Sequence, residues 1–160
     1  MSGGIATEGF RMEKNYEEIA KRLYPNMKEM ESGMSFGSDY SPLLYHFGIP
    51  IIRIDDDDYQ GNTWLLWHNG YILEEKFSYL MFGWGSCSGC DALLGCRSYR
   101  EVGDLIEELE AAIKFFPSTE EALEFFNTHD WQGDFSRGWE TKTFVALCKV
   151  YLTAVQGRGG

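Results

Sequence analysis

Residues 63–84 read TWLLWHNGYILEEKFSYLMFGW, and this stretch decides the predicted fold. Thr63–His68 is rich in aromatic and apolar side chains, which is typical of a strand. Asn69-Gly70 is a strong signal for a tight hairpin turn. Tyr71–Leu73 is expected to begin the return strand, and Phe77–Trp84 to form its long aromatic part. The stretch therefore predicts an antiparallel hairpin.

The chain on either side of this hairpin supplies a further strand and several helices. Ile49–Ile54 is short and rich in branched residues, which predicts a strand. Helical spacing of apolar residues begins after Asn15, and the second half of the chain is helical in pattern. The order of helix, then sheet, then helices favours an α+β fold. We expect a three- to four-stranded antiparallel sheet with helices packed on one face.

Three of the expected helices begin with a capping signal, a polar residue followed by Glu three positions later. The pairs are Asn15 with Glu18, Ser98 with Glu101 and Ser118 with Glu121. Pro25 is expected to end or kink the first helix, because its ring clashes with the preceding turn. Ser88 with Asp91 is expected to cap a short helix through Leu94, and the last helix to run from Trp139 to Gln156.

Length and composition favour one ordered domain. The chain has 160 residues, of which 44% are hydrophobic and 16% aromatic. This length is typical of a single domain, and the aromatic content excludes a disordered protein. We expect a loose segment over residues 1–13, one α+β domain over 14–156 and a frayed tail over 157–160. Aromatic rings beyond the needs of a core point to a binding surface.

The charge of the chain restricts its partners. It has 25 acidic and 14 basic residues, a formal charge of −11. Such a surface repels nucleic-acid phosphates and anionic membranes, so no direct nucleic-acid binding is expected, and it favours a basic protein partner. No apolar run approaches the roughly 20 residues needed to span a bilayer, and the N-terminus lacks the apolar core of a signal peptide. We expect a cytoplasmic protein, whose thiols stay reduced.

The densest acidic segment is Asp55, Asp56, Asp57 and Asp58. It follows a predicted strand and is expected to form a solvated loop, with a binding patch as the functional alternative. Trp84, between two glycines, is the candidate aromatic contact of such a patch. A calcium-binding loop starting at Asp56 is disfavoured, because its twelfth position is Trp67 where a bidentate Glu is required.

The most unusual stretch is FGWGSCSGCDALLGC at residues 82–96, which holds three of the four cysteines. It resembles a block in small uncharacterised proteins of bacteria and their phages. The resemblance covers residues 79–96 and, more loosely, the segment from 115–118 to 130–131. It implies no activity, and no residue role is carried over from it.

Three interpretations of the cysteines compete. The spacing of Cys87 and Cys90 lets both sulfurs reach one zinc ion, but a second pair is missing. The remaining ligands would have to come from elsewhere in the chain, from Cys96, Cys148, His46, His68 or His129. The same spacing at a strand-to-helix junction is typical of a redox dithiol, but the parallel βαβ context is absent. The structural interpretation packs both residues under the aromatic strand as small apolar side chains that react slowly. We favour the structural interpretation, with no cofactor and with zinc as the alternative.

No familiar catalytic motif is present: the sequence has no Gly-x-Ser-x-Gly, phosphate-binding loop, dinucleotide fingerprint or His-Glu-x-x-His. This favours a non-catalytic protein. The leading hypothesis is an acidic protein that binds a basic partner, such as a phage-encoded inhibitor, anti-CRISPR or otherwise anti-defence, of host nucleic-acid-binding machinery. Its carboxylates would cover a basic groove in place of phosphates. The alternative is a thiol-redox or zinc-binding protein that uses Cys87 and Cys90, and a third hypothesis is a small immunity-type or regulatory protein.

Overall fold

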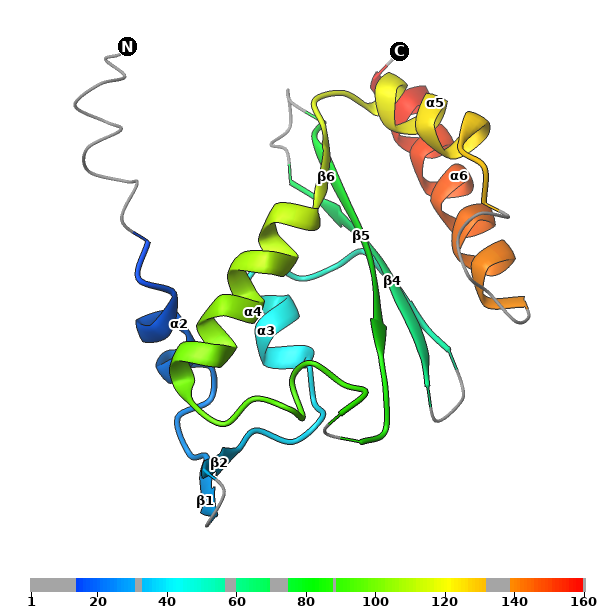
Figure 1. The fold of residues 1–160 in the computed structure, drawn as a ribbon. Helices are drawn as coiled ribbons and strands as arrows, with labels where there is room; N and C mark the ends of the chain where they lie inside the picture. The colour runs from blue at the N-terminus through cyan, green and yellow to red at the C-terminus, as the bar shows by residue number, and fades with distance from the viewer. Residues whose placement is uncertain are drawn as a thin grey trace, which may run out of the picture.

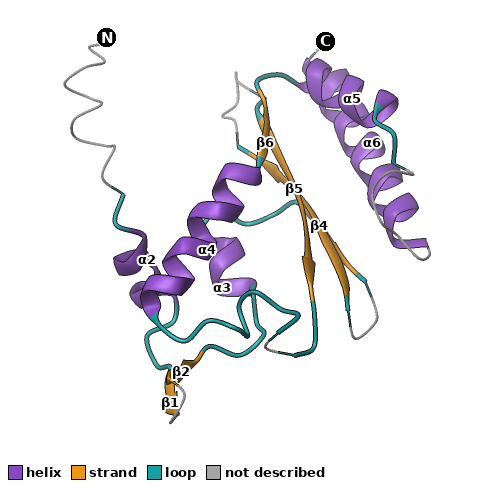
Figure 2. Ribbon diagram, in the orientation of Figure 1, coloured by secondary structure: helices purple, strands orange, loops and turns teal. Residues whose placement is uncertain are grey.

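The structure, a computed structural model, describes residues 14–30, 33–56, 60–69, 75–87, 89–131 and 139–159. Within these ranges the chain forms five helices and six strands. Four strands make a central sheet with helices on either side of it (Figure 1 and Figure 2). A separate small hairpin is formed by β1 (Lys28–Met30) and β2 (Gly33–Ser35).

The central sheet is antiparallel throughout, with the strand order β3, β4, β5, β6. The strands span Ile52–Asp55, Gly61–His68, Phe77–Trp84 and Lys114–Phe116, respectively. β4 and β5 pair along their whole length, from Gly61 opposite Trp84 to His68 opposite Phe77. The predicted antiparallel pairing of these two strands is therefore confirmed. The tight turn predicted at Asn69-Gly70 is wrong, because a two-residue turn would place His68 opposite Tyr71, whereas the register places it opposite Phe77. The expected turn residue Gly70 and the strand start at Tyr71–Leu73 lie outside the described residues.

One face of the sheet is covered by α3 (Ser41–Tyr45) and α4 (Tyr99–Ala112), with α2 (Tyr16–Leu23) packed against α4. Alternate residues of a strand share a face, and Leu65, Trp67, Leu80 and Phe82 are the strand residues on this side. They form one buried cluster with helix residues that include Ala20, Leu43, Leu44, Val102 and Ile106.

The opposite face is covered by α5 (Thr119–Thr128) and α6 (Trp139–Gly159). The strand residues on this side are Trp64, Leu66, Phe77 and Tyr79, and they pack with helix residues that include Ala122, Phe126, Phe144, Cys148 and Leu152. The predicted α+β class and strand number are confirmed, but the helices lie on both faces rather than one. The reason is that β4 is buried from Asn62 to Trp67, so each face of the strand needs an apolar cover.

The three predicted capping signals are confirmed. Asn15, Ser98 and Ser118 each accept a hydrogen bond from the backbone N–H of the Glu three residues later, at 3.1, 3.2 and 3.1 Å. Each such bond satisfies an N–H group that the helix itself leaves unpaired and stabilises the helix by about 1 kcal/mol. The starts of α2, α4 and α5 are therefore fixed by local sequence.

Other local expectations need correction. α2 ends at Leu23, before Pro25 as expected, but the apolar residues beyond it enter β1 rather than a longer helix. The short helix expected through Leu94 is a series of turns over the described residues 89–95. α6 continues to Gly159, so residues 157–159 are helical where we expected a frayed tail.

The outer side of α6 is apolar as well as the side that faces the sheet. Trp139, Leu147 and Val150 are 61%, 44% and 70% exposed. These side chains leave an apolar strip on the surface of α6, which is unusual for a helix that covers a sheet. No helix within the described residues combines the length and apolar character needed to cross a lipid bilayer.

The crossing of α2 and α4 depends on Gly103. A Cβ at this position would lie 2.8 Å from the carbonyl carbon of Tyr16 and 2.9 Å from the backbone nitrogen of Glu17. The helix backbones therefore approach too closely for a side chain to fit between them. We expect Gly103→Ala to lower the free energy of unfolding by about 1–3 kcal/mol, measured by urea denaturation.

Gly157 in α6 is the matched control, because beyond its own helix backbone and chain neighbours no atom lies within 4 Å of a Cβ at that position. Gly157→Ala is expected to leave the free energy of unfolding unchanged or to raise it by up to about 1 kcal/mol, because Ala favours a helix. A Gly103→Ala protein as stable as Gly157→Ala would contradict the close helix crossing.

Candidate binding cleft

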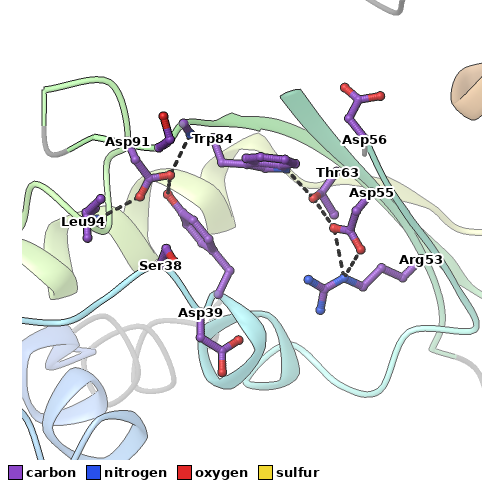
Figure 3. Close-up of a pocket in the computed structure, with 12 residues that line it drawn as sticks. Ser38, Asp39, Arg53, Asp55, Asp56, Thr63, Trp84, Asp91 and Leu94 are labelled. Carbon is purple, nitrogen blue, oxygen red and sulfur yellow. Dashed lines mark hydrogen bonds and ion pairs between the residues drawn. The ribbon is translucent and has the colours of Figure 1, made fainter. Parts of the chain in front are cut away.

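An open cleft of about 490 Å³ lies where β3 and β5 end and β4 begins (Figure 3). Its walls come from the segment that leads into α3, this end of the sheet and the loop after β5. The lining residues are Ser38, Asp39, Tyr40, Arg53, Asp55, Asp56, Thr63, Trp84, Gly85, Ser86, Asp91 and Leu94. Four aspartates and one arginine give the cleft a net negative charge.

Hydrogen bonds that cross three strands hold Trp84 in the cleft wall. Its indole Nε1 donates to Thr63 Oγ1 at 2.9 Å, and the Thr63 hydroxyl donates to Asp55 Oδ1 (Figure 3). Thr63 and Asp55 are also paired residues of β4 and β3. Because the Thr63 hydroxyl both accepts and donates, it fixes the indole relative to the carboxylate.

The charge of Arg53 is compensated within the cleft. Its Nε donates to both carboxylate oxygens of Asp55, at 3.3 and 3.2 Å, and its Nη1 donates to Ser41 Oγ at 3.1 Å. This ion pair is partly exposed, so its own contribution to stability is modest. Its structural effect is to direct the guanidinium along the cleft wall, as Figure 3 shows.

The remaining two surface carboxylates are held by backbone groups. Asp39 Oδ1 accepts the N–H of Ser41 at 3.0 Å, at the start of α3. Asp56 Oδ2 accepts the N–H of Asn62 at 2.7 Å, and the Asp56 N–H donates to the Asn62 carbonyl at 2.9 Å. Both side chains are therefore positioned before any ligand arrives.

Asp91 organises the loop between β5 and α4. It is only 3% exposed. Its Oδ1 accepts from the Gly85 N–H at 3.0 Å and the Tyr40 hydroxyl at 3.1 Å, and its Oδ2 accepts from the Leu94 N–H at 2.8 Å. One buried carboxylate thus joins the end of β5, the start of α3 and the turn after Asp91.

Tyr40 completes this buried junction. Its hydroxyl oxygen also accepts the N–H of Leu93 at 3.1 Å. Burial raises the pKa of Tyr40 well above its ordinary value, so the hydroxyl keeps its proton and donates to Asp91. The interlinked bonds hold the cysteine-containing loop against the rest of the protein.

The structure brings together three of the residues singled out as a binding patch, Asp55, Asp56 and Trp84, in one cleft. Asp57 and Asp58 lie outside the described residues. Sequence reasoning missed Asp39, Arg53 and Asp91 as members of this site. Asp39 had a usable signal, since it precedes the Ser41-Pro42 start of a helix, but nothing local placed it in the same cleft as Trp84.

The cysteines differ from the favoured interpretation. Cys87 and Cys90 are exposed rather than packed under the aromatic strand, and their sulfurs are joined as a disulfide. Cys96 is buried apart from them and donates to the Ala92 carbonyl at 3.2 Å. Burial raises the pKa of Cys96 to about 11. The described part of the chain holds no group of three His, Cys, Asp or Glu side chains arranged to bind a metal ion.

Comparisons of the chain with protein-family models, curated proteins and solved structures gave no match.

We expect Asp91→Asn to lower the free energy of unfolding by about 1–3 kcal/mol. In the wild type both carboxylate oxygens of Asp91 accept hydrogen bonds. In the variant one of these oxygens is replaced by an NH₂ group, so at least one hydrogen bond is lost and two donors face each other. Asp104→Asn on the exposed side of α4 is the control and should change stability by less than about 0.5 kcal/mol. Equal thermal and urea stabilities of the two variants would contradict the role of Asp91.

Proposed function

We propose that this protein is a non-catalytic binding protein whose cleft takes basic side chains of a partner protein. The observation that supports this most directly is that Asp39, Asp55 and Asp56 line the same cleft as the indole of Trp84. Carboxylates attract a lysine or arginine through charge, and a tryptophan face attracts the same cation through its ring electrons. The two groups together favour a cation over a neutral ligand.

Hydrogen bonds and an ion pair within the cleft hold its charged side chains in place before a ligand binds. Arg53 is already paired with Asp55 and Ser41, so the internal cation is held in the wall. Asp39 and Asp56 are fixed by backbone N–H groups. Side chains ordered in advance lose less conformational entropy when a ligand binds, and this raises affinity.

Within this class, we further propose an inhibitor of a nucleic-acid-binding protein, encoded by a phage as an anti-CRISPR or other anti-defence factor. The net charge of −11 disfavours binding to nucleic acid itself and favours a partner that is basic. A protein that binds phosphates presents Lys and Arg in a groove, and clustered carboxylates compete with phosphates for them. The resemblance of residues 79–96 to phage and bacterial proteins motivates the source.

The test compares two triple variants that change the net charge equally. Asp39→Asn, Asp55→Asn and Asp56→Asn alter the cleft, whereas Asp104→Asn, Glu107→Gln and Glu108→Gln alter exposed positions on α4 that do not line it. The probe is a labelled hexa-arginine peptide, with association followed by stopped-flow anisotropy. Three contacts of about 0.5 kcal/mol each predict a roughly tenfold weaker affinity for the cleft triple, mostly through a slower on-rate.

The α4 triple should weaken binding much less, and the difference between the triples should vanish at high salt, where charges are screened. If both triple variants bound hexa-arginine equally weakly, net charge alone would explain the effect, and the cleft would not be the binding site. The inhibitor proposal has its own readout. Wild type should displace DNA from a basic nucleic-acid-binding protein of the host, and the cleft triple should fail to do so.

A further inference from the structure

The loop that carries Cys87 and Cys90 adjoins the cleft but has chemistry of its own. Gly85 and Ser86 line the cleft, and the two exposed cysteines follow directly along the chain. The Cα atoms of Cys87 and Cys90 are 5.2 Å apart, within the usual range for a disulfide. The Cys87 carbonyl accepts the N–H groups of Cys90 at 3.0 Å and Asp91 at 2.9 Å, so one turn holds both cysteines.

The two sulfurs have different surroundings. Cys90 Sγ lies 2.9 Å from the Cys87 nitrogen, whose N–H it accepts, and 3.2 Å from the Cys87 carbonyl oxygen. The N–H stabilises negative charge on Cys90 Sγ as the bond between the sulfurs breaks. The carbonyl can accept an S–H from Cys90 once the pair is reduced. Both reduced forms of Cys90 therefore have a partner already in place.

Gly85 adds a steric difference. A Cβ at Gly85 would lie 2.8 Å from Cys90 Sγ and 2.6 Å from the Cys90 carbonyl oxygen. The buried backbone of Gly85 thus packs directly against Cys90 and covers one side of that residue.

From this asymmetry we propose that Cys87–Cys90 is a thiol–disulfide exchange site, in which external thiols attack Cys87 and Cys90 is the leaving sulfur. An external thiolate forms a bond to Cys87 Sγ, the bond between the two cysteine sulfurs breaks, and its electron pair stays on Cys90. Cys90 then takes a proton from water. A second thiolate attacks the external sulfur of the mixed disulfide and releases Cys87 as a thiolate. Two external thiols are oxidised to a disulfide, and the cysteine pair is reduced to a dithiol.

The charge next to the loop selects the class of thiol. Asp39, Asp55 and Asp56 lie in the adjoining cleft and repel anions. We therefore assign neutral or cationic thiols as the reactants, such as a cysteine within a basic protein segment. Anionic thiols are disfavoured at low ionic strength and become comparable when salt screens the carboxylates.

The first experiment traps the mixed disulfide on the oxidised, full-length wild type. The protein is mixed with cysteamine, quenched with acid at short times and mapped by mass spectrometry. The adduct is expected on Cys87 in about tenfold excess over Cys90, because access and the leaving group both favour attack there. Cys96 and Cys148 are internal controls that should stay unmodified, since both are buried and burial raises the pKa of each thiol.

A pair of glycine variants tests the cause of the selectivity. Gly85→Ala displaces Cys90 and should reduce the preference for Cys87. A Cβ at Gly89 meets no atom within 4 Å apart from its chain neighbours, so Gly89→Ala should preserve the preference. The charge assignment is tested with cysteamine, 2-mercaptoethanol and 2-mercaptoethanesulfonate. Rate constants per thiolate, each divided by that of the same thiol with a small neutral disulfide to remove intrinsic nucleophilicity, should fall in that order by about three- to tenfold overall at low salt and converge at high salt.

The mapping of adducts on the wild-type protein can overturn the proposal by itself, so the test does not require that any variant folds. Adducts mainly on Cys90, or equally on both cysteines, would contradict the proposal that Cys87 is attacked and Cys90 is the leaving sulfur. Adducts that form only after denaturation would make the pair structural. One equivalent of tightly held zinc, whose chelation releases two reactive thiols, would establish the zinc alternative instead. Each of these results leaves the cleft proposal intact, because hexa-arginine binding is measured separately.

Discussion

The central strands β4 and β5 carry large apolar side chains on both faces. Because both faces must be shielded from water, helices pack on each side of the sheet. Trp64 and Trp67 point to opposite sides, and they are 0% and 1% exposed. Burying a tryptophan removes about 150–250 Å² from water, a favourable contribution on the order of 5 kcal/mol before conformational entropy is subtracted. β6 connects the helices of one face to those of the other. It lies at the edge of the sheet between α4 on one face and α5 on the other, so the chain changes sides there.

The same strand pairing determines where the cleft lies. The β4–β5 register brings Gly61 and Trp84 to one end of the sheet, and the β3–β4 register sets Asp55 beside Thr63 at that end. The loop after Trp84 then has to return to α4, and the buried carboxylate of Asp91 holds its path. The cleft is therefore formed by segments distant in sequence that meet because of strand register and one buried polar junction.

Sequence patterns with a local cause were the most predictable. Helix caps depend on residues three positions apart, and the span of β5 was predicted in full because its aromatic run is long. The coverage of both faces was missed, although the uninterrupted apolar run around Trp64–Trp67 is typical of a strand buried on two sides. α3 and β6 were missed because elements of five and three residues carry too little periodicity. The cleft was predicted only in part, since the strand register and the hydrogen bond between Tyr40 and Asp91 are tertiary contacts that no local spacing encodes.

The cleft and the cysteine loop are coupled by charge if both proposals hold. Exchange creates thiolate charge on the loop, beside carboxylates that make this charge unfavourable. A basic side chain bound near Asp55 and Trp84 would compensate part of that repulsion and so favour opening of the disulfide. Linkage is reciprocal, so the reduced, more anionic loop would bind the basic partner more tightly by the same factor. Gly85 is where such coupling would act, because its N–H is bound by Asp91 while its backbone packs against Cys90. A substitution at Gly85 should therefore disturb both properties, whereas charge changes on α4 should disturb neither strongly.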